Sequence, residues 1–143
     1  MCVDIHADIH LNIDASIVES IDMKTLVEKN CIHDESSKNP VEQYERDKYL
    51  TQLKGWQLVN QGSSIERTFN FKNYYHTISF VNAIAWIANR EAHHPDLVVS
   101  YASCKVLFTT HESGGLSNND FICAAKVTTL IESGNFGPQL KQE

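Results

Sequence analysis

The segment that most constrains the fold is residues 73–92, the longest stretch of the chain with helical periodicity. Its apolar residues recur at spacings of three and four, which predicts a helix with one buried face. Pro95 ends the segment, because proline does not continue a helix. The predicted buried face consists of Ile78, Val81, Ala85, Ala88 and Ala92. Such a face needs a second layer to pack against, so the flanking segments decide the architecture.

A pair of short strand-like segments lies on each side of this central helix. Residues 56–60 and 64–71 precede it and are joined by the turn-forming sequence Gln61-Gly62-Ser63. Residues 97–102 and 105–111 follow it. Two predicted hairpins indicate an antiparallel sheet of four strands.

Two further helices complete the predicted order of elements. One opens at Asn39-Pro40, where Asn is a good N-cap and Pro suits the first helical position, and it stops at Gly55. The other spans residues 117–131. The order α-β-β-α-β-β-α predicts an α+β fold, a four-stranded antiparallel sheet with helices packed on one face.

Residues 1–30 are predicted to form an N-terminal extension, with the main domain at 31–143. Apolar and polar residues alternate through residues 1–14, as in a half-buried strand, and residues 16–29 have a helical pattern. A solvated face of an edge strand is the favoured interpretation of the polar side of the strand, and a divalent-metal site is the alternative. That side carries Asp4, His6, Asp8 and His10.

Composition and charge exclude several classes of protein. The chain has 143 residues, of which 42% are hydrophobic, enough for one domain with a core. Its net charge of −6 argues against a nucleic-acid-binding surface. The longest apolar stretch, residues 80–88, is too short to cross a bilayer, and no signal peptide is recognisable. We therefore expect no membrane partner and a cytoplasmic location.

The four cysteines are predicted to be free thiols. They are Cys2, Cys31, Cys104 and Cys123, and no two form a Cys-x-x-Cys pair. This spacing argues against zinc-ribbon and thioredoxin-like sites. Cys104 and Cys123 are expected to behave as small core residues.

Three histidines are the candidates for chemistry. His93 and His94 stand at the end of the central helix, directly before Pro95, where the negative end of the helix dipole favours a protonated imidazole. A histidine pair there can hold one proton donor and one acceptor near neutral pH. His111 ends the predicted fourth strand on its more polar face, pointing to solvent or a cleft, and Gly114-Gly115 follow it.

Each of these residues also has a simpler interpretation. For His93 and His94 a solvated helix terminus is the interpretation that composition alone favours. A metal site formed by the three histidines is a further alternative, but the pair does not complete a familiar zinc motif. Asp120 completes the pattern Ser117-x-x-Asp120, so it is also explained as a helix cap.

Several spaced motifs resemble the pterin-4a-carbinolamine dehydratase family over about residues 40–131. They are His93-His94-Pro95-Asp96, Tyr101, Thr110-His111, Gly115-Leu116-Ser117, Asp120, and upstream Gly55-Trp56 and Thr68-Phe69-Asn70-Phe71-Lys72. The order of elements also resembles that family. Two positions depart from it: Asn89 and Ala92 stand where the family usually carries charged residues, Ala92 where many members have Asp. A carboxylate that orients a histidine is therefore expected to be missing.

The resemblance implies the dehydration of a 4a-hydroxytetrahydropterin to the quinonoid dihydropterin, in tetrahydrobiopterin recycling. It implies no cofactor: no metal, flavin or nucleotide. The expected catalytic residues are His93, His94 and His111, and Asp120 and Pro95 support them. The substrate is expected to contact Ala92, His93, His94, Thr109, Thr110, His111 and Trp56, with Trp56 covering the pterin face.

The family also implies a homodimer or homotetramer. Some members act as dimerisation partners of homeodomain transcription factors, so a binding protein of that kind is the alternative to an enzyme.

Overall fold

The computed structural model describes residues 26–134, and the helices and strands within them follow the predicted order. The strand predicted for residues 1–14, with its Asp and His side chains, lies outside the described residues, as does most of the helix predicted for 16–29. Residues 26–28 are helical. The main elements are α2 (Gln43–Gln52), β1 (Gln57–Val59), β2 (Ser64–Asn70), α3 (Tyr74–Glu91), β3 (Asp96–Val99), β4 (Ser103–Phe108) and α4 (Asn118–Ser133).

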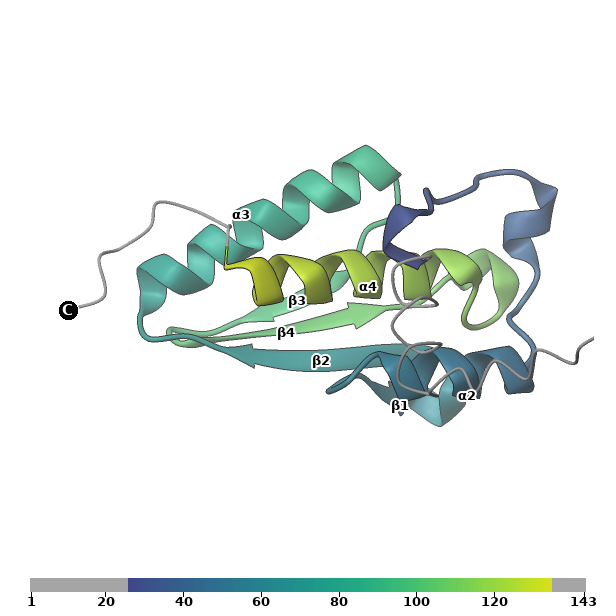
Figure 1. Cartoon of the computed structure of the whole chain (residues 1–143), viewed down its shortest axis with the longest axis horizontal. Coiled ribbons are helices and arrows are strands. Elements are labelled where there is room, and N and C mark those ends of the chain that lie inside the picture. Colours follow the sequence, from purple (N-terminus) through teal and green to yellow (C-terminus); the bar gives the residue numbers. More distant parts are fainter. Residues whose placement is uncertain (1–25, 135–143) are drawn as a thin grey trace, which may run out of the picture.

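The four strands form one antiparallel sheet in the order β1-β2-β4-β3. β2 and β4 make the central pair, in which Ile65 lies opposite Phe108 and Phe69 opposite Cys104. The helices α3 and α4 pack on one face of the sheet (Figure 1). α2 lies beside α4, with the rings of Tyr49 and Phe121 5.1 Å apart. The predicted α+β architecture is confirmed.

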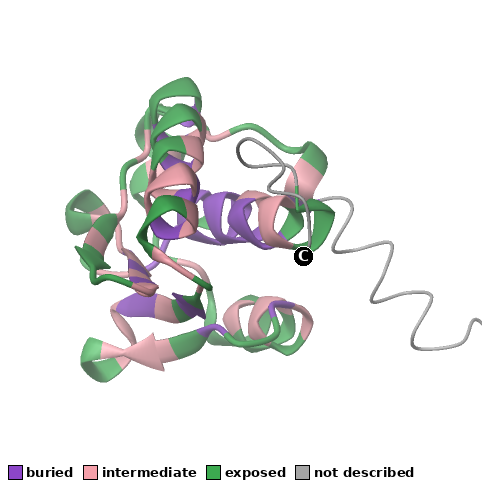
Figure 2. Ribbon diagram, turned by 90° about the vertical axis from the view of Figure 1, so that its left-hand side faces the viewer, coloured by how far each residue is buried: buried purple, intermediate pink, exposed green. Residues whose placement is uncertain are grey.

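α4 is the central helix of the core, and most of its residues from Asn119 to Thr128 are buried (Figure 2). α3 buries a different stripe from the predicted one, because Ala85 and Ala92 are exposed. The large side chains of Phe80 and Ile84, with Ala88, define its inner face. The buried residues of α3 are Thr77, Phe80, Ile84, Ala88 and Glu91.

The predicted bounds of three elements are wrong. α2 begins at Gln43, not at Asn39-Pro40, because the Val41 amide donates to the Leu116 carbonyl (2.8 Å) and holds the chain out of helical geometry. Asn39 instead caps the end of a 3₁₀ turn, Glu35–Lys38. β3 ends at Val99 rather than at residue 102. β4 spans Ser103–Phe108 and stops before His111.

Residues 26–33, which we call the N-terminal segment, pack against the ends of α3 and α4. Leu26 belongs to the core cluster, and the Lys126 ammonium donates to the Val27 carbonyl (2.8 Å). The His33 ring and the Glu91 carbonyl are 2.7 Å apart. Residues 26–30, assigned to the extension by sequence, are thus in contact with the main domain. Across the described chain, 26–134, no helix has the length and apolar character to span a membrane.

Candidate active site

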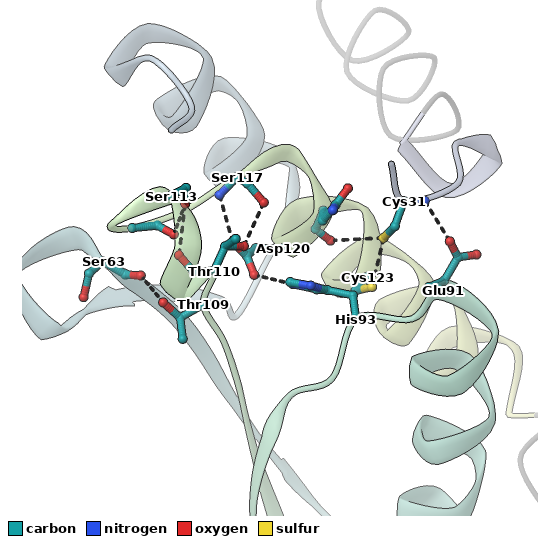
Figure 3. A network of polar contacts seen from close by, with 12 residues as sticks. Cys31, Ser63, Glu91, His93, Thr109, Thr110, Ser113, Ser117, Asp120 and Cys123 are labelled. Atoms are coloured by element: carbon teal, nitrogen blue, oxygen red, sulfur yellow. Dashed lines mark hydrogen bonds and ion pairs between the residues drawn. The ribbon is translucent and has the colours of Figure 1, made fainter. Parts of the chain in front are cut away.

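The predicted site residues come from three chain segments that meet at one end of the sheet. His93 and His94 follow α3, Thr109 to His111 follow β4, and Asp120 lies in the first turn of α4. α3 ends because Ala92 adopts a left-handed conformation (φ 50°), and the His93 amide then donates back to the Ala88 carbonyl (3.1 Å). This Schellman-type turn ends the helix before Pro95 has any influence. It directs the His93 ring toward α4 (Figure 3).

His93 is paired with Asp120. The His93 Nε2 atom lies 2.6 Å from the Asp120 Oδ1 atom, and the two side chains are 11% and 0% exposed. The His93 ring also stacks on Phe108, with centroids 6.0 Å apart and planes 10° from parallel. An ionised carboxylate only accepts hydrogen bonds, so His93 donates from Nε2. Its Nδ1 atom is therefore the nitrogen left for proton exchange.

The second oxygen of Asp120 holds the start of α4. Its Oδ2 atom accepts from the Thr110 hydroxyl (2.7 Å) and from the Ser117 amide (2.9 Å). The Ser117 hydroxyl is itself 2.8 Å from Thr110. Asp120 thus forms the capping box expected from Ser117-x-x-Asp120 and also contacts a histidine. The two interpretations that the sequence offered as alternatives coexist.

The carboxylate near His93 comes from α4 and not from α3. The sequence led us to expect a missing carboxylate, since Asn89 and Ala92 replace charged residues. Glu91, the nearest acidic residue in the chain, faces the other way: it is buried and accepts from the Cys31 amide (2.8 Å). Asp120 takes the place beside His93 from a position 27 residues later in the chain.

His111 lies on the wall of a hollow of about 460 Å³, which neither His93 nor Asp120 lines. The prediction that it ends a strand is wrong, because β4 ends at Phe108, opposite Ile65 in β2, and His111 begins a 3₁₀ turn. Its side chain is exposed, as expected. The lining residues are Asn60, Ser63, Ser64, Asp96, Leu107, Thr109, His111, Gly114 and Gly115.

Some of the predicted site residues line this hollow and others do not. Thr109 lies on its wall and donates from its hydroxyl to the Ser63 carbonyl (2.7 Å). Ala92, His93, His94 and Thr110 are not among the lining residues. His94 is exposed, whereas the Thr110 hydroxyl is bound to Asp120. Pro95 connects His94 to Asp96, the first residue of β3.

Trp56 does not belong to the site, so its prediction as a pterin-covering residue is wrong. It is 5% exposed and packs between the rings of Phe69 and Phe108. Its indole Nε1 donates to the Thr128 hydroxyl (2.9 Å). Trp56 is a core residue whose one polar group is satisfied inside the protein.

Sequence reasoning missed the polar groups that the β1–β2 turn and β3 bring to the hollow. Asn60 and Gln61 have positive φ values (54° and 59°), whereas the sequence predicted a strand as far as Asn60 and a turn at Gln61-Gly62-Ser63. Asp96 stood in the His-His-Pro-Asp motif but received no role. Among the side chains of residues 26–134, no three His, Cys, Asp or Glu are grouped as a metal site requires.

Comparisons with known proteins identify the family of the chain. The family model described as pterin 4 alpha carbinolamine dehydratase matches residues 39–130. The chain belongs to this family. A protein of Nitrosomonas europaea, provisionally named a pterin-4-alpha-carbinolamine dehydratase, is 53% identical over 76% of this chain and 95% of its own length. A relative from Stenotrophomonas maltophilia with the same provisional name is 48% identical over 78% of this chain and 96% of its own.

A solved structure shows the same fold. The crystal structure of a transcriptional coactivator/pterin dehydratase from Brucella melitensis aligns with a TM-score of 0.62 and 29% identity. The alignment covers 64% of this chain and 98% of that one. The family domain therefore accounts for the sheet and the helices α2 to α4, and it contains every predicted site residue.

Proposed function

We propose that this protein is a hydro-lyase that dehydrates a 4a-hydroxytetrahydropterin to the quinonoid dihydropterin, in the recycling of tetrahydrobiopterin. The reaction breaks the bond between C4a and its hydroxyl oxygen and removes the proton of N5. Hydroxide is a poor leaving group, so an acid must protonate the oxygen, and a base must accept the N5 proton. Histidine suits both tasks because its ordinary pKa, about 6.5, is close to neutrality.

The hydrogen bond between His93 and Asp120 is the observation that carries this proposal. A buried carboxylate fixes both the tautomer and the ring orientation of the histidine, which a general acid or base requires. His111 provides a second, exposed imidazole on the wall of the hollow. We assign the proton transfers to His93 and His111, one on each side of the reacting edge, and assign His94 to binding and orienting the pterin.

Several backbone amides near the histidines already donate hydrogen bonds within the protein. The amides of Ala92 and His93 donate to the carbonyl of Ala88, and the Thr110 amide donates to the Gly115 carbonyl (3.1 Å). Because these three amides are already bound, a ligand at Ala92, His93 or Thr110 can use the backbone carbonyl oxygens but not the N–H groups. A pterin ring carries an amino group and ring N–H groups that suit such acceptors. We therefore expect the backbone to recognise the donor edge of the substrate.

The test is a rapid-mixing assay of carbinolamine dehydration on the full-length protein with synthetic substrate. We expect His93→Ala and His111→Ala each to lower kcat by about 10²-fold or more, the usual contribution of a positioned acid or base. His76→Ala is the matched control, because His76 lies in the first turn of α3, away from the hollow. Wild-type rates in both site variants, with His76→Ala also active, would reject the assignment.

We also propose that the protein is a homodimer or homotetramer. β3 is an edge strand of the sheet, and its residues Val98 and Val99 are 56% and 40% exposed. An apolar edge strand is a ready surface for pairing with another chain. Light scattering of the purified protein would give the molar mass, and a value equal to one chain would refute the proposal.

A further inference from the structure

A pair of thiols lies beside the candidate active site and takes no part in the proposed chemistry. The sulfur atoms of Cys31 and Cys123 are 3.5 Å apart and join the N-terminal segment to α4 (Figure 3). Cys123 is fully buried and Cys31 is half-buried. Cys123 lies one helical turn after Asp120, whose carboxylate binds His93.

Hydrogen bonds from both helices hold Cys31 over Cys123. Its amide donates to the Glu91 carboxylate at the end of α3. The next residue, Ile32, bonds the Asn119 side chain twice: its amide donates to Oδ1 (3.0 Å) and its carbonyl accepts from Nδ2 (2.8 Å). A disulfide has an S–S length of about 2.0 Å, so closure needs a relative movement of about 1.5 Å from the present 3.5 Å.

We infer that Cys31 and Cys123 form a thiol–disulfide site that closes to an intramolecular disulfide by exchange with a small disulfide such as glutathione disulfide. In the first step the Cys31 thiolate attacks a sulfur of glutathione disulfide, forms a mixed disulfide and releases one glutathione thiolate. In the second step the Cys123 sulfur attacks the Cys31 sulfur, and its proton passes to the departing second glutathione. Two protein thiols are oxidised and one glutathione disulfide is reduced to two glutathiones.

The burial of the two thiols sets the order of the steps. Cys31 is the partner that a dissolved disulfide can reach, because Cys123 has no exposed surface. The hydrogen bond to Cys31 and burial both raise the pKa of the Cys123 thiol. Cys123 is therefore a slow nucleophile, and the mixed disulfide on Cys31 forms before the cross-link.

The cross-link ties the N-terminal segment to α4 across 92 residues of sequence. Closing so long a loop restricts the unfolded chain and stabilises the folded protein. Oxidation therefore raises the thermal midpoint of unfolding. It also fixes the N-terminal segment against α4, the helix that carries Asp120. Neither effect requires a change in the histidines themselves.

The experiment uses the full-length protein with Cys2→Ser, so that only the three described cysteines respond. The reduced protein is incubated with glutathione disulfide, and peptides are mapped by mass spectrometry without reduction. We expect a peptide that joins Cys31 to Cys123, a loss of two hydrogen atoms, and a rise of several degrees in the thermal midpoint that dithiothreitol reverses. Cys104→Ser, which changes a buried thiol elsewhere in the sheet, should behave in the same way.

The single variants distinguish this path from nonspecific oxidation. Cys123→Ser should stop at the Cys31–glutathione adduct, and Cys31→Ser should take up no glutathione at Cys123. The inference is overturned if Cys31 does not react, or if the protein that keeps both Cys31 and Cys123 stops at the Cys31 adduct. It is also overturned if the cross-link joins other cysteines or two chains, or if the thermal midpoint does not rise. None of these readouts depends on dehydratase activity.

Discussion

Asp120→Asn is the sharpest perturbation that the structure offers, because it separates the two functions of one carboxylate. The Thr110 hydroxyl and the Ser117 amide both donate to Oδ2, whereas Oδ1 faces His93. An asparagine in the same rotamer keeps its carbonyl oxygen toward the two donors. Its amide nitrogen then faces His93 and donates where Asp120 accepted. The cap of α4 is retained, but the proton on His93 must move from Nε2 to Nδ1.

The expected losses follow from these contacts. The change makes three buried charge-assisted hydrogen bonds neutral, but it also removes the desolvation cost of a buried charge, so the net loss is about 1–2 kcal/mol. A domain of this size loses roughly 4 °C in Tm per kcal/mol. We therefore expect Asp120→Asn to fold with a Tm lower by about 4–8 °C. A histidine held in the wrong tautomer cannot offer Nδ1 as a base, so kcat should fall about 10²-fold or more.

The assay is rapid-mixing dehydration at a temperature well below the Tm of every variant. Ser117→Ala is the matched control, because it removes a hydroxyl that bonds Thr110 and leaves the His93–Asp120 contact in place. It should cost about 1 kcal/mol of stability with little change in kcat. If Asp120→Asn turns over at the wild-type rate, the tautomer of His93 does not matter and the reasoning fails. If Ser117→Ala loses as much activity as Asp120→Asn, the cap and not the histidine pair is responsible.

Three further perturbations test other parts of the structure. Ala92→Gly should stabilise the protein by about 0.5–1 kcal/mol, because glycine adopts the left-handed conformation (φ 50°) without strain; a lower urea midpoint would contradict this. Trp56→Phe should cost about 2 kcal/mol through the lost bond to Thr128 and the lost volume, with KM unchanged; a raised KM would return Trp56 to the substrate site. Burial raises the pKa of Cys104 from 9.0 to about 11, so as the pH rises the unfolded chain loses this proton before the folded protein does. The free energy of unfolding should therefore fall between pH 9 and 11. An equal fall in Cys104→Ala would rule out this thiol as the cause.

The element order could be predicted because it rests on local patterns. The periodicity of residues 73–92 matches α3 (Tyr74–Glu91) closely, and both hairpins are present. The failures depend on partners distant in sequence. Asn39-Pro40 has the composition of a helix start, but Val41 is bound to Leu116, 75 residues away. Trp56 looked available for a ligand because its partner, Thr128, lies 72 residues further along the chain.

The site was predicted only in part. The spacing of motifs in the sequence identifies candidate residues, but it does not show which of their side chains contact one another in the fold. Strand parity gave the correct exposure for His111 with an incorrect reason, since the strand ends three residues earlier. No sequence pattern predicted that Asn60 and Ser63 line the hollow. The β1–β2 turn reaches the end of β4 only through the pairing of β2 with β4.

We therefore expect the departure at Asn89 and Ala92 to affect function less than the sequence indicated. A carboxylate buried without partners is costly, and Asp120 avoids that cost because three donors surround it: Thr110, Ser117 and the ring of His93. The first turn of α4 adds the positive end of a helix dipole, which also favours a carboxylate. The charge that orients His93 is thus held by the fold of β4 and α4, independently of the residues that precede the histidine pair. For this reason we expect Asn89→Asp to change the dehydration rate far less than Asp120→Asn, and the opposite order would show that α3 is where the missing charge matters.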